Sequence, residues 1–326
     1  MTDYLQEGLM QDYLGSWSVH LEVVLAGLLF GIFFNFIDTI SDKTFIRRKS
    51  FGYIIFVKSL LYIFMMLIVV FIVAGIFYLF DIEPFVNFQD IGDIASIEFI
   101  ISWIIYFAFA VLLMNFFNQV NRKFGPGNLS SFLIGKYHKP RDEHRIFLFL
   151  DLKGSTTIAE KLGHKVYSQF LRSCFHDLTD IVLRYNADIY QYVGDEVVLS
   201  WRIKDVSHTI HCVGCYFAYA KRLKDRQGYY TNKFKAEPEF KGGMDMGVVT
   251  VAEIGDIKRE IAYHGDVLNT ASRIQDQCKI LDKDLLISEN VEKNLLKLNG
   301  FKKEFIGDVN LRGKEKALKI YSLNYS

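Results

Sequence analysis

The sequence predicts an α-helical membrane segment followed by an α+β domain that fills the C-terminal two thirds of the chain. Two observations carry this prediction. The apolar excess of the 326 residues, which include 29 Phe and 18 Tyr, lies mostly in long runs of the first third. Beyond residue 145, short apolar strands alternate with segments whose apolar residues recur every three or four positions. Lys and Arg number 38 against 37 for Asp and Glu, so no net positive field points to nucleic acid.

Three apolar runs predict about three membrane helices. They cover residues 19–40, 54–80 and 99–117. The second run is long enough to cross a bilayer with some tilt. Its one charge, Lys58, lies near an end of the run, where the ammonium group can snorkel to the interface.

The loops between these runs predict the orientation. Basic residues follow the first run (Lys43, Arg47, Arg48, Lys49) and the third run (Arg122, Lys123, Lys136, Lys139). The connection between the second and third runs carries only acids. By the positive-inside rule, the N-terminus lies outside and the C-terminal domain is cytoplasmic. We therefore expect a multi-pass protein of the inner (plasma) membrane, and the first 18 residues lack the basic region of a cleavable signal peptide.

Polar residues inside the runs leave an alternative open. Glu22, Asn35, Asp38 and Lys58 are costly in a bilayer, and such residues also line ion pathways. All four lie at segment ends or on faces from which the interface is reachable. An anchor or sensor is therefore favoured over a small transporter with a regulatory domain.

We expect a membrane domain over residues 1–118, a linker over 119–144 and a catalytic domain over 145–326. Gly125-Pro126-Gly127 interrupts any helix that continues from the membrane. The pair Cys212 and Cys215 has the spacing of a metal or redox motif, but it lies in an apolar helical pattern with no second pair. These thiols are expected to be structural and reduced, in a cytoplasmic domain.

The C-terminal domain reads as β-α-β-β-α-β with additions, which is the ferredoxin-like arrangement. Polar loops and apolar periodicity define its elements. We expect strands at 145–152, 188–193, 197–201, 241–251, 260–264 and 285–288, helices at 157–162, 165–185, 207–224, 267–281 and 289–298, and a terminal hairpin. A polar, Tyr-containing loop is expected after residue 224.

Two of these strands end at an acidic residue. Asp151 follows an apolar strand and precedes a small-residue loop, and Asp195 lies in the tight turn of the next hairpin. Singly, Asp151 could cap a helix and Asp195 could be a turn residue. Together, two such carboxylates can hold a pair of divalent cations against a polyphosphate. Glu196 should point to the opposite face from Asp195 and act as an ion-pair partner.

Four motifs, in order, resemble the class III nucleotidyl cyclases, the adenylate and guanylate cyclase family. They are Phe149-Leu-Asp-Leu-Lys-Gly-Ser-Thr156, Gly194-Asp195, Met246-Gly-Val-Val-Thr250 and Gly265-Asp-Val-Leu-Asn-Thr-Ala-Ser-Arg273. The resemblance covers about residues 145–323. It implies a cyclase that makes a cyclic nucleotide and pyrophosphate from a nucleoside triphosphate. It also implies two Mg²⁺ or Mn²⁺ ions for each site.

The resemblance implies a role for each matching residue. Asp151, Asp195 and the backbone carbonyl of Leu152 would bind the metals. Backbone amides of Gly154, Ser155 and Thr156 would bind phosphates, and Arg312, with Lys314 as a weaker candidate, would grip the terminal phosphates. Asn269 would position the ribose, and Arg273 would meet the charge of the transition state. Because the family's sites form between two domains, one chain that carries both sets is expected to work as a homodimer.

The sequence departs from the family at the positions that read the base. Adenylate cyclases usually have a Lys where this chain has Gln191, and an Asp or Thr where it has Ala262. A Gln amide can donate or accept, so it discriminates less firmly than a charged donor. ATP is the favoured substrate, with GTP or a pyrimidine triphosphate as alternatives. A non-catalytic nucleotide-binding regulatory module on a membrane sensor is the other alternative.

Overall fold

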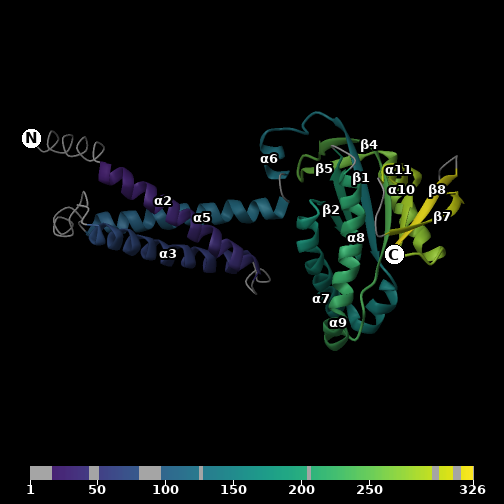
Figure 1. Cartoon of the computed structure of the whole chain (residues 1–326), viewed down its shortest axis with the longest axis horizontal. Coiled ribbons are helices and arrows are strands. Elements are labelled where there is room, and N and C mark those ends of the chain that lie inside the picture. Colours follow the sequence, from purple (N-terminus) through teal and green to yellow (C-terminus); the bar gives the residue numbers. More distant parts are fainter. Residues whose placement is uncertain are drawn as a thin grey trace, which may run out of the picture. The chain divides into compact units, whose positions relative to one another are not determined.

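We obtained a computed structural model of the chain. It describes residues 17–43, 51–80, 97–124, 128–203, 207–295, 301–310 and 317–325. The chain forms two compact units, Met1–Phe124 and Gly125–Ser326 (Figure 1). Each unit is described by itself below.

Three long helices make up the described part of the first unit. They are α2 (Trp17–Lys43), α3 (Phe51–Leu79) and α5 (Ile97–Phe124). The helices α2 and α5 contain the first and third predicted runs, and α3 covers the second run except for Phe80. Within the described residues, the stretches Val23–Ile40 and Gly52–Leu79 are long and apolar enough to cross a membrane. The stretch Ile105–Asn121 of α5 is apolar but shorter.

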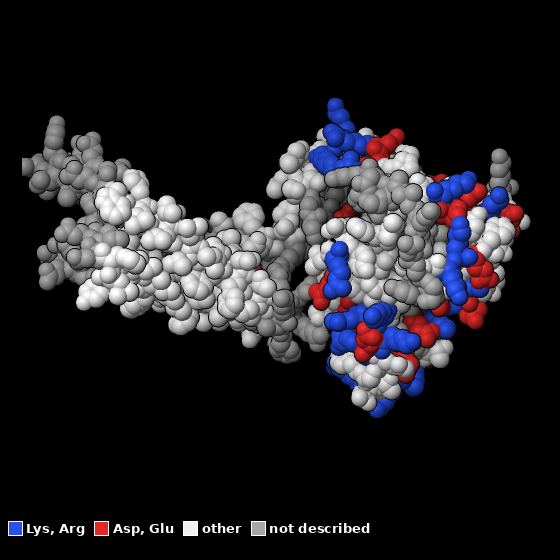
Figure 2. All heavy atoms as spheres, viewed as in Figure 1, with Lys and Arg blue, Asp and Glu red and all other residues white. Residues whose placement is uncertain are grey.

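Polar side chains lie inside this unit and apolar side chains lie outside. Lys58 of α3 is only 3% exposed and forms an ion pair with Asp38 of α2. The Tyr62 hydroxyl donates to the same carboxylate at 2.9 Å. The prediction that Lys58 snorkels to the interface is therefore wrong, because a carboxylate on the neighbouring helix holds its ammonium group. Phe71 is 80% exposed, and Figure 2 shows few charged side chains on the visible face of these helices.

A mixed sheet organises the second unit. In chain order the elements are α6 (Asn128–Leu133), β1 (Arg141–Leu152), α7 (Ser155–Arg184), β2 (Asp188–Val193), β3 (Glu196–Arg202), α8 (Ser207–Asp225), α9 (Gln227–Phe234), β4 (Phe240–Ile254), β5 (Glu260–His264), α10 (Asp266–Ile280), β6 (Leu285–Ser288), α11 (Glu289–Lys293), β7 (Phe301–Val309) and β8 (Leu318–Tyr325). The strand order is β2-β3-β1-β4-β6-β8-β7, and β5 pairs with the C-terminal end of β4. The predicted β-α-β-β-α-β core is confirmed as β1-α7-β2-β3-α8-β4.

Helices cover both faces of this sheet because β1 is apolar on both sides. Leu148 and Leu150 pack in the core that includes residues of α7 and α8, whereas Phe147 and Phe149 pack with residues of α10. Gly243 of β4 lets α10 lie very close, since a Cβ there would be 2.3 Å from a backbone nitrogen of α10. The end of α10 is thereby held beside the end of β1, where Asp151 lies.

Several element predictions differ from the structure. The segment after α8 was expected to be a loop but forms α9, because Tyr230 and Phe234 bury their rings in the core. The two helices expected before residue 185 are α7, which bends at Gly163 with φ 70°. All four cysteine side chains are buried, in agreement with the structural reading of Cys212 and Cys215.

Candidate active site

The structure brings Asp151 and Asp195 together. Asp151 lies at the end of β1, and antiparallel pairing of Leu150 with Val197 places the β2–β3 turn beside it. Gly194 has φ 62°, which favours glycine and makes this turn tight. Burial raises the pKa of Asp151, and the charge and hydrogen bonding of Asp195 raise it further. The two carboxylates therefore form one negatively charged group.

Lys279 adds a cation to this group that the motifs did not predict. Its Nζ lies 3.0 Å from Oδ2 of Asp151. The hydrogen bond and the negative charge of Asp151 raise the pKa of Lys279, and Lys279 in turn opposes the upward pKa shift of Asp151. Lys279 comes from the last turn of α10, so its placement depends on how α10 crosses the sheet.

Glu196 lies among acids, and its predicted role as an ion-pair partner is wrong. Burial, followed by the charges of Asp151, Asp276 and Asp195, raises the pKa of Glu196 to about 7. No Lys or Arg among the described residues is a cause of its pKa shift. The reason is the register: since Val197 pairs with Leu150, the next residue on each strand brings Glu196 alongside Asp151.

This pKa predicts how stability depends on pH. The folded state holds the Glu196 proton more tightly than the unfolded state, so unfolding becomes easier as pH rises from about 4.5 to about 7. Replacing Glu196 by Gln should remove this loss of folding stability at high pH. We expect the thermal midpoint of Glu196→Gln to exceed that of the parent at pH 8 in EDTA, and the difference to shrink at pH 4.5. A pH-independent difference would contradict the assignment.

The loop after β1 begins a helix without a side-chain cap. Gly154 is the N-cap of α7 with φ 67°, and as a glycine it makes no side-chain cap hydrogen bond. The first N–H groups of a helix have no partner within the helix. Donors in the first turn, including those of Ser155 and Thr156, can therefore bind phosphate oxygens. For Gly154 and Leu152, the predicted backbone contacts stay predictions.

The structure does not bring Asn269 and Arg273 to the two aspartates of the same chain. Both lie on α10, where Asn269 is exposed and Arg273 is partly exposed. Lys279 of the same helix is the residue that reaches Asp151. With a rise of about 1.5 Å per residue, Arg273 lies about 9 Å and Asn269 about 15 Å farther along the helix axis.

The base-reading positions lie on strands whose neighbouring residues touch. Gln191 of β2 is exposed, and Ala262 of β5 is buried opposite Ala252. Their chain neighbours Tyr190 and Tyr263 have ring centroids 4.9 Å apart. The rings of Tyr190 and Tyr263 thus meet over the strands β3, β1 and β4 that separate β2 from β5 in the sheet. Arg312 and Lys314 lie outside the described residues.

The donors at the end of β1 fit a divalent metal that arrives with a nucleotide. Within the described ranges, no group of three or more His, Cys, Asp or Glu side chains could hold a metal ion alone. Mg²⁺ is usually bound by one or two carboxylates together with substrate phosphates. Asp151 and Asp195, beside the start of α7, provide that arrangement.

The second unit thus combines a ferredoxin-like sheet with two paired acids at the end of β1, beside the start of α7. Residues 137–325 match the family model of the adenylate and guanylate cyclase catalytic domain, so the chain belongs to that family.

The curated relatives agree with this assignment. The chain is 31% identical over 205 residues to Adenylate cyclase 2 of Rhizobium meliloti (strain 1021). The aligned residues make up 63% of this chain and 56% of the relative. It is 25% identical over 179 residues to the adenylate cyclase of Anabaena cylindrica, covering 54% of this chain and 36% of the relative. The chain thus spans about half or less of the curated relatives' length.

Two solved structures share the fold. The adenylyl cyclase CyaB from P. aeruginosa superposes with a TM-score of 0.52 at 20% identity, covering 58% of this chain and 97% of that one. A bacterial light-regulated adenylyl cyclase has a TM-score of 0.56 at 20% identity, covering 67% of this chain and 64% of that one.

Proposed function

We propose that this chain is a membrane-anchored adenylate cyclase that converts ATP to 3′,5′-cyclic AMP and pyrophosphate as a homodimer. The observation that carries the proposal is the pairing of Asp151 with Asp195 at the end of β1, in a chain of the cyclase family. The names of the relatives, which are adenylate cyclases, support ATP as the substrate.

In the proposed reaction, the ribose 3′-oxygen bonds to the α-phosphorus and the bond from that phosphorus to pyrophosphate breaks. The proton of the 3′-hydroxyl leaves to water. Two divalent cations, when bound, lower the pKa of the hydroxyl and neutralise phosphate charge. Asp151 and Asp195 would hold these ions. Amides of Gly154, Ser155 and Thr156 would bind phosphate oxygens, which orients the leaving group.

The second half of the site would come from a second copy of the chain. Asn269 and Arg273 are displaced along α10 from the aspartates of their own chain, which supports this arrangement. In a two-fold dimer, each copy lends these residues to the other, so two equivalent sites form. There, Asn269 would position the ribose and Arg273 would stabilise the charge on the transferring phosphate.

The buried polar side chains and exposed apolar side chains of the first unit support a membrane anchor. Lys58 and Asn115 are buried while Phe71 and many other apolar side chains are exposed, which is the reverse of a water-soluble helix bundle. By the positive-inside rule, the basic residues around the helices support an N-terminus outside the inner (plasma) membrane and a cyclase domain in the cytoplasm. In this proposal α5 is the third span.

Product identification tests the proposed activity. The full chain in detergent with Mn²⁺ and all four ribonucleoside triphosphates should yield cyclic AMP as its main cyclic product by mass spectrometry. The double variant Asp151→Asn/Asp195→Asn is the control. A cyclic product from GTP or a pyrimidine nucleotide would change the substrate but keep the enzyme class. No cyclic product from any nucleotide would refute a cyclase.

Ala262 favours a second candidate function. Its methyl group cannot hydrogen-bond a base, which fits a nucleotide-binding regulatory module that has lost substrate selection. Such a module would bind triphosphates without turning them over. Tight nucleotide binding by the parent chain, with no product and no effect of Asp195→Asn in cells, would support it.

Lys279 should weaken metal binding, since its ammonium group lies where a cation would be attracted. We expect Lys279→Met to bind Mn²⁺ more tightly by a few-fold, and not more than about tenfold because Lys279 is exposed and screened. Titration of Mn²⁺ by electron paramagnetic resonance in the presence of a saturating, non-cyclisable ATP analogue measures this. Lys283→Met is the matched control, because Lys283 pairs with Glu304 instead. Equal or weaker binding by Lys279→Met would contradict the expectation.

A further inference from the structure

The short helix α6 ends in a rigid turn. The N–H of Gly135 donates to the Phe132 carbonyl at 2.9 Å, and the N–H of Lys136 donates to the Ser131 carbonyl at 2.9 Å. With Gly135 at φ 67°, these bonds form a Schellman motif, which satisfies the last carbonyls of the helix. The side chains of Leu133 and Ile134 are therefore presented by an ordered backbone.

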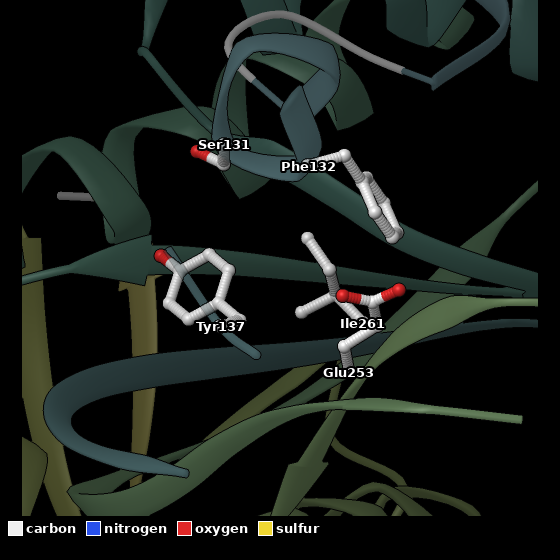
Figure 3. A pocket seen from close by; sticks show the side chains of 5 residues that line it. All are labelled: Ser131, Phe132, Tyr137, Glu253 and Ile261. Atoms are coloured by element: carbon white, nitrogen blue, oxygen red, sulfur yellow. The ribbon is translucent and has the colours of Figure 1, made fainter. Parts of the chain in front are cut away.

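One side of this turn is fixed to the sheet of the same unit. Tyr137 is 6% exposed, its carbonyl accepts from the N–H of Glu253 at 2.9 Å, and its hydroxyl donates to Glu143 at 3.0 Å. Figure 3 shows Phe132 and Tyr137 on either side of Ile261, in a small pocket that Ser131 and Glu253 also line. These contacts hold α6 against β4 and β5.

The other side of the turn presents two adjacent apolar side chains to solvent. Leu133 is 78% exposed and Ile134 is 82% exposed. Exposed apolar residues are ordinary when scattered singly. Here two neighbours project from a backbone that is hydrogen-bonded and docked, while Phe132 beside them packs inward. Leu133 and Ile134 thus form a small exposed apolar pair on an ordered turn that is docked to the sheet.

Basic residues flank Leu133 and Ile134 in the sequence. Between residues 122 and 141 the chain carries five basic residues and no acidic one: Arg122, Lys123, Lys136, Lys139 and Arg141. Two nearby acids have partners on the sheet: Asp142 accepts from the Thr250 hydroxyl at 2.7 Å, and Glu253 pairs with Arg259 at 3.2 Å. Lys136 lies 3.9 Å from the carboxylate of Glu143, which Arg145 also pairs, so the excess positive charge of this stretch rests on Lys139 and Arg141.

We propose that Leu133 and Ile134 insert into the headgroup region of an anionic bilayer, while Lys136, Lys139 and Arg141 contact lipid phosphates. The inference rests on the membrane anchoring proposed above. Only residues 125–127 separate α5 from α6 in the sequence, so α6 follows the proposed third span after three residues. Apolar insertion combined with basic residues is the chemistry of proteins that lie on anionic membranes. A protein partner would have to match both features on an element that follows the proposed span after three residues.

Depth-dependent quenching tests the proposal on the full chain in nanodiscs. All four native cysteines are buried, so a single introduced cysteine can be labelled selectively with bimane. We expect brominated lipid to reduce the fluorescence of Ile134→Cys by about half, as for a side chain about 5–10 Å inside the interface. Leu133→Cys is the second probe. Asn232→Cys on α9, at the far end of the unit from α6 in Figure 1, should not be quenched.

Lipid composition and one further probe separate the outcomes. Quenching of Ile134→Cys should grow as phosphatidylglycerol replaces phosphatidylcholine, and Lys136→Gln/Lys139→Gln/Arg141→Gln should lose that dependence. Phe71→Cys, in the middle of α3, reports the anchor itself. Quenching of Phe71→Cys without quenching at residues 133 and 134 overturns the lipid contact and leaves the anchor intact. A spectral blue shift at residue 134 without quenching overturns it in favour of a protein partner.

Discussion

Replacing Asp151 or Asp195 by Asn is expected to lower cyclic nucleotide formation by about 10²–10³-fold. A metal ion typically contributes several kcal/mol of charge stabilisation in the transition state, and each 1.36 kcal/mol is about tenfold in rate. Asn keeps the shape of Asp but loses the negative charge that holds the ion. Rates measured with saturating Mn²⁺ and ATP would show the loss as a lower kcat. The single variants Asp151→Asn and Asp195→Asn should lose activity to a similar extent, since the two carboxylates form one charged group.

Complementation distinguishes a shared site from a site within one chain. One variant carries Asp151→Asn/Asp195→Asn, and the other carries Asn269→Ala/Arg273→Ala. If α10 serves the partner's aspartates, each mixed dimer contains one intact site. Random assortment makes half of the dimers mixed, so co-expression should restore about one quarter of the parent activity.

The control is each variant expressed alone, with its unfolding midpoint close to that of the parent. Co-expressed variants that stay inactive while forming mixed dimers would contradict the shared site. Variants that are active alone would contradict the assignment of Asp151 and Asp195. These two failures are separate, because the first concerns which copy supplies α10 and the second concerns the chemistry at β1.

The catalytic fold was largely predictable because its signals are local. The strands at Glu260–His264 and Leu285–Ser288 have the predicted bounds, since apolar runs between turn residues define them. The helix α9 was not predictable in the same way. Its sequence contains Gly228 and several residues with weak helix propensity, and tertiary packing of Tyr230 and Phe234 stabilises it.

The candidate site was predictable only where motifs carry it. Asp151 and Asp195 were recognised because each ends a strand at a turn. Lys279 and Glu196 depend on how separate elements cross: α10 must lie on β4, and β3 must pair with β1 in one register. No local pattern encodes these crossings. The surroundings of Glu196 were therefore misjudged from strand alternation alone, which says nothing of the neighbouring strand.

Replacing Lys58 by Met should destabilise the helical unit by about 2–3 kcal/mol. Removing one partner of a buried ion pair typically costs about 3–5 kcal/mol, because the other charge is left without compensation. The carboxylate of Asp38 is 30% exposed and keeps the hydrogen bond from Tyr62, so a value below that range is expected. Unfolding of the full chain in detergent, followed by helical circular dichroism, measures the change.

A double-mutant cycle separates the ion pair from packing. Asp38→Asn/Lys58→Met removes both charges and should recover most of the stability that Lys58→Met loses, since no buried charge remains. Tyr62→Phe, which removes only one hydrogen bond, should cost about 1 kcal/mol. If the double variant were as unstable as Lys58→Met, the methylene chain of Lys58 rather than its charge would hold α2 against α3. A recovery would instead show that Asp38 requires a cation, and that the pairing of these two helices is set by charge in an otherwise apolar bundle.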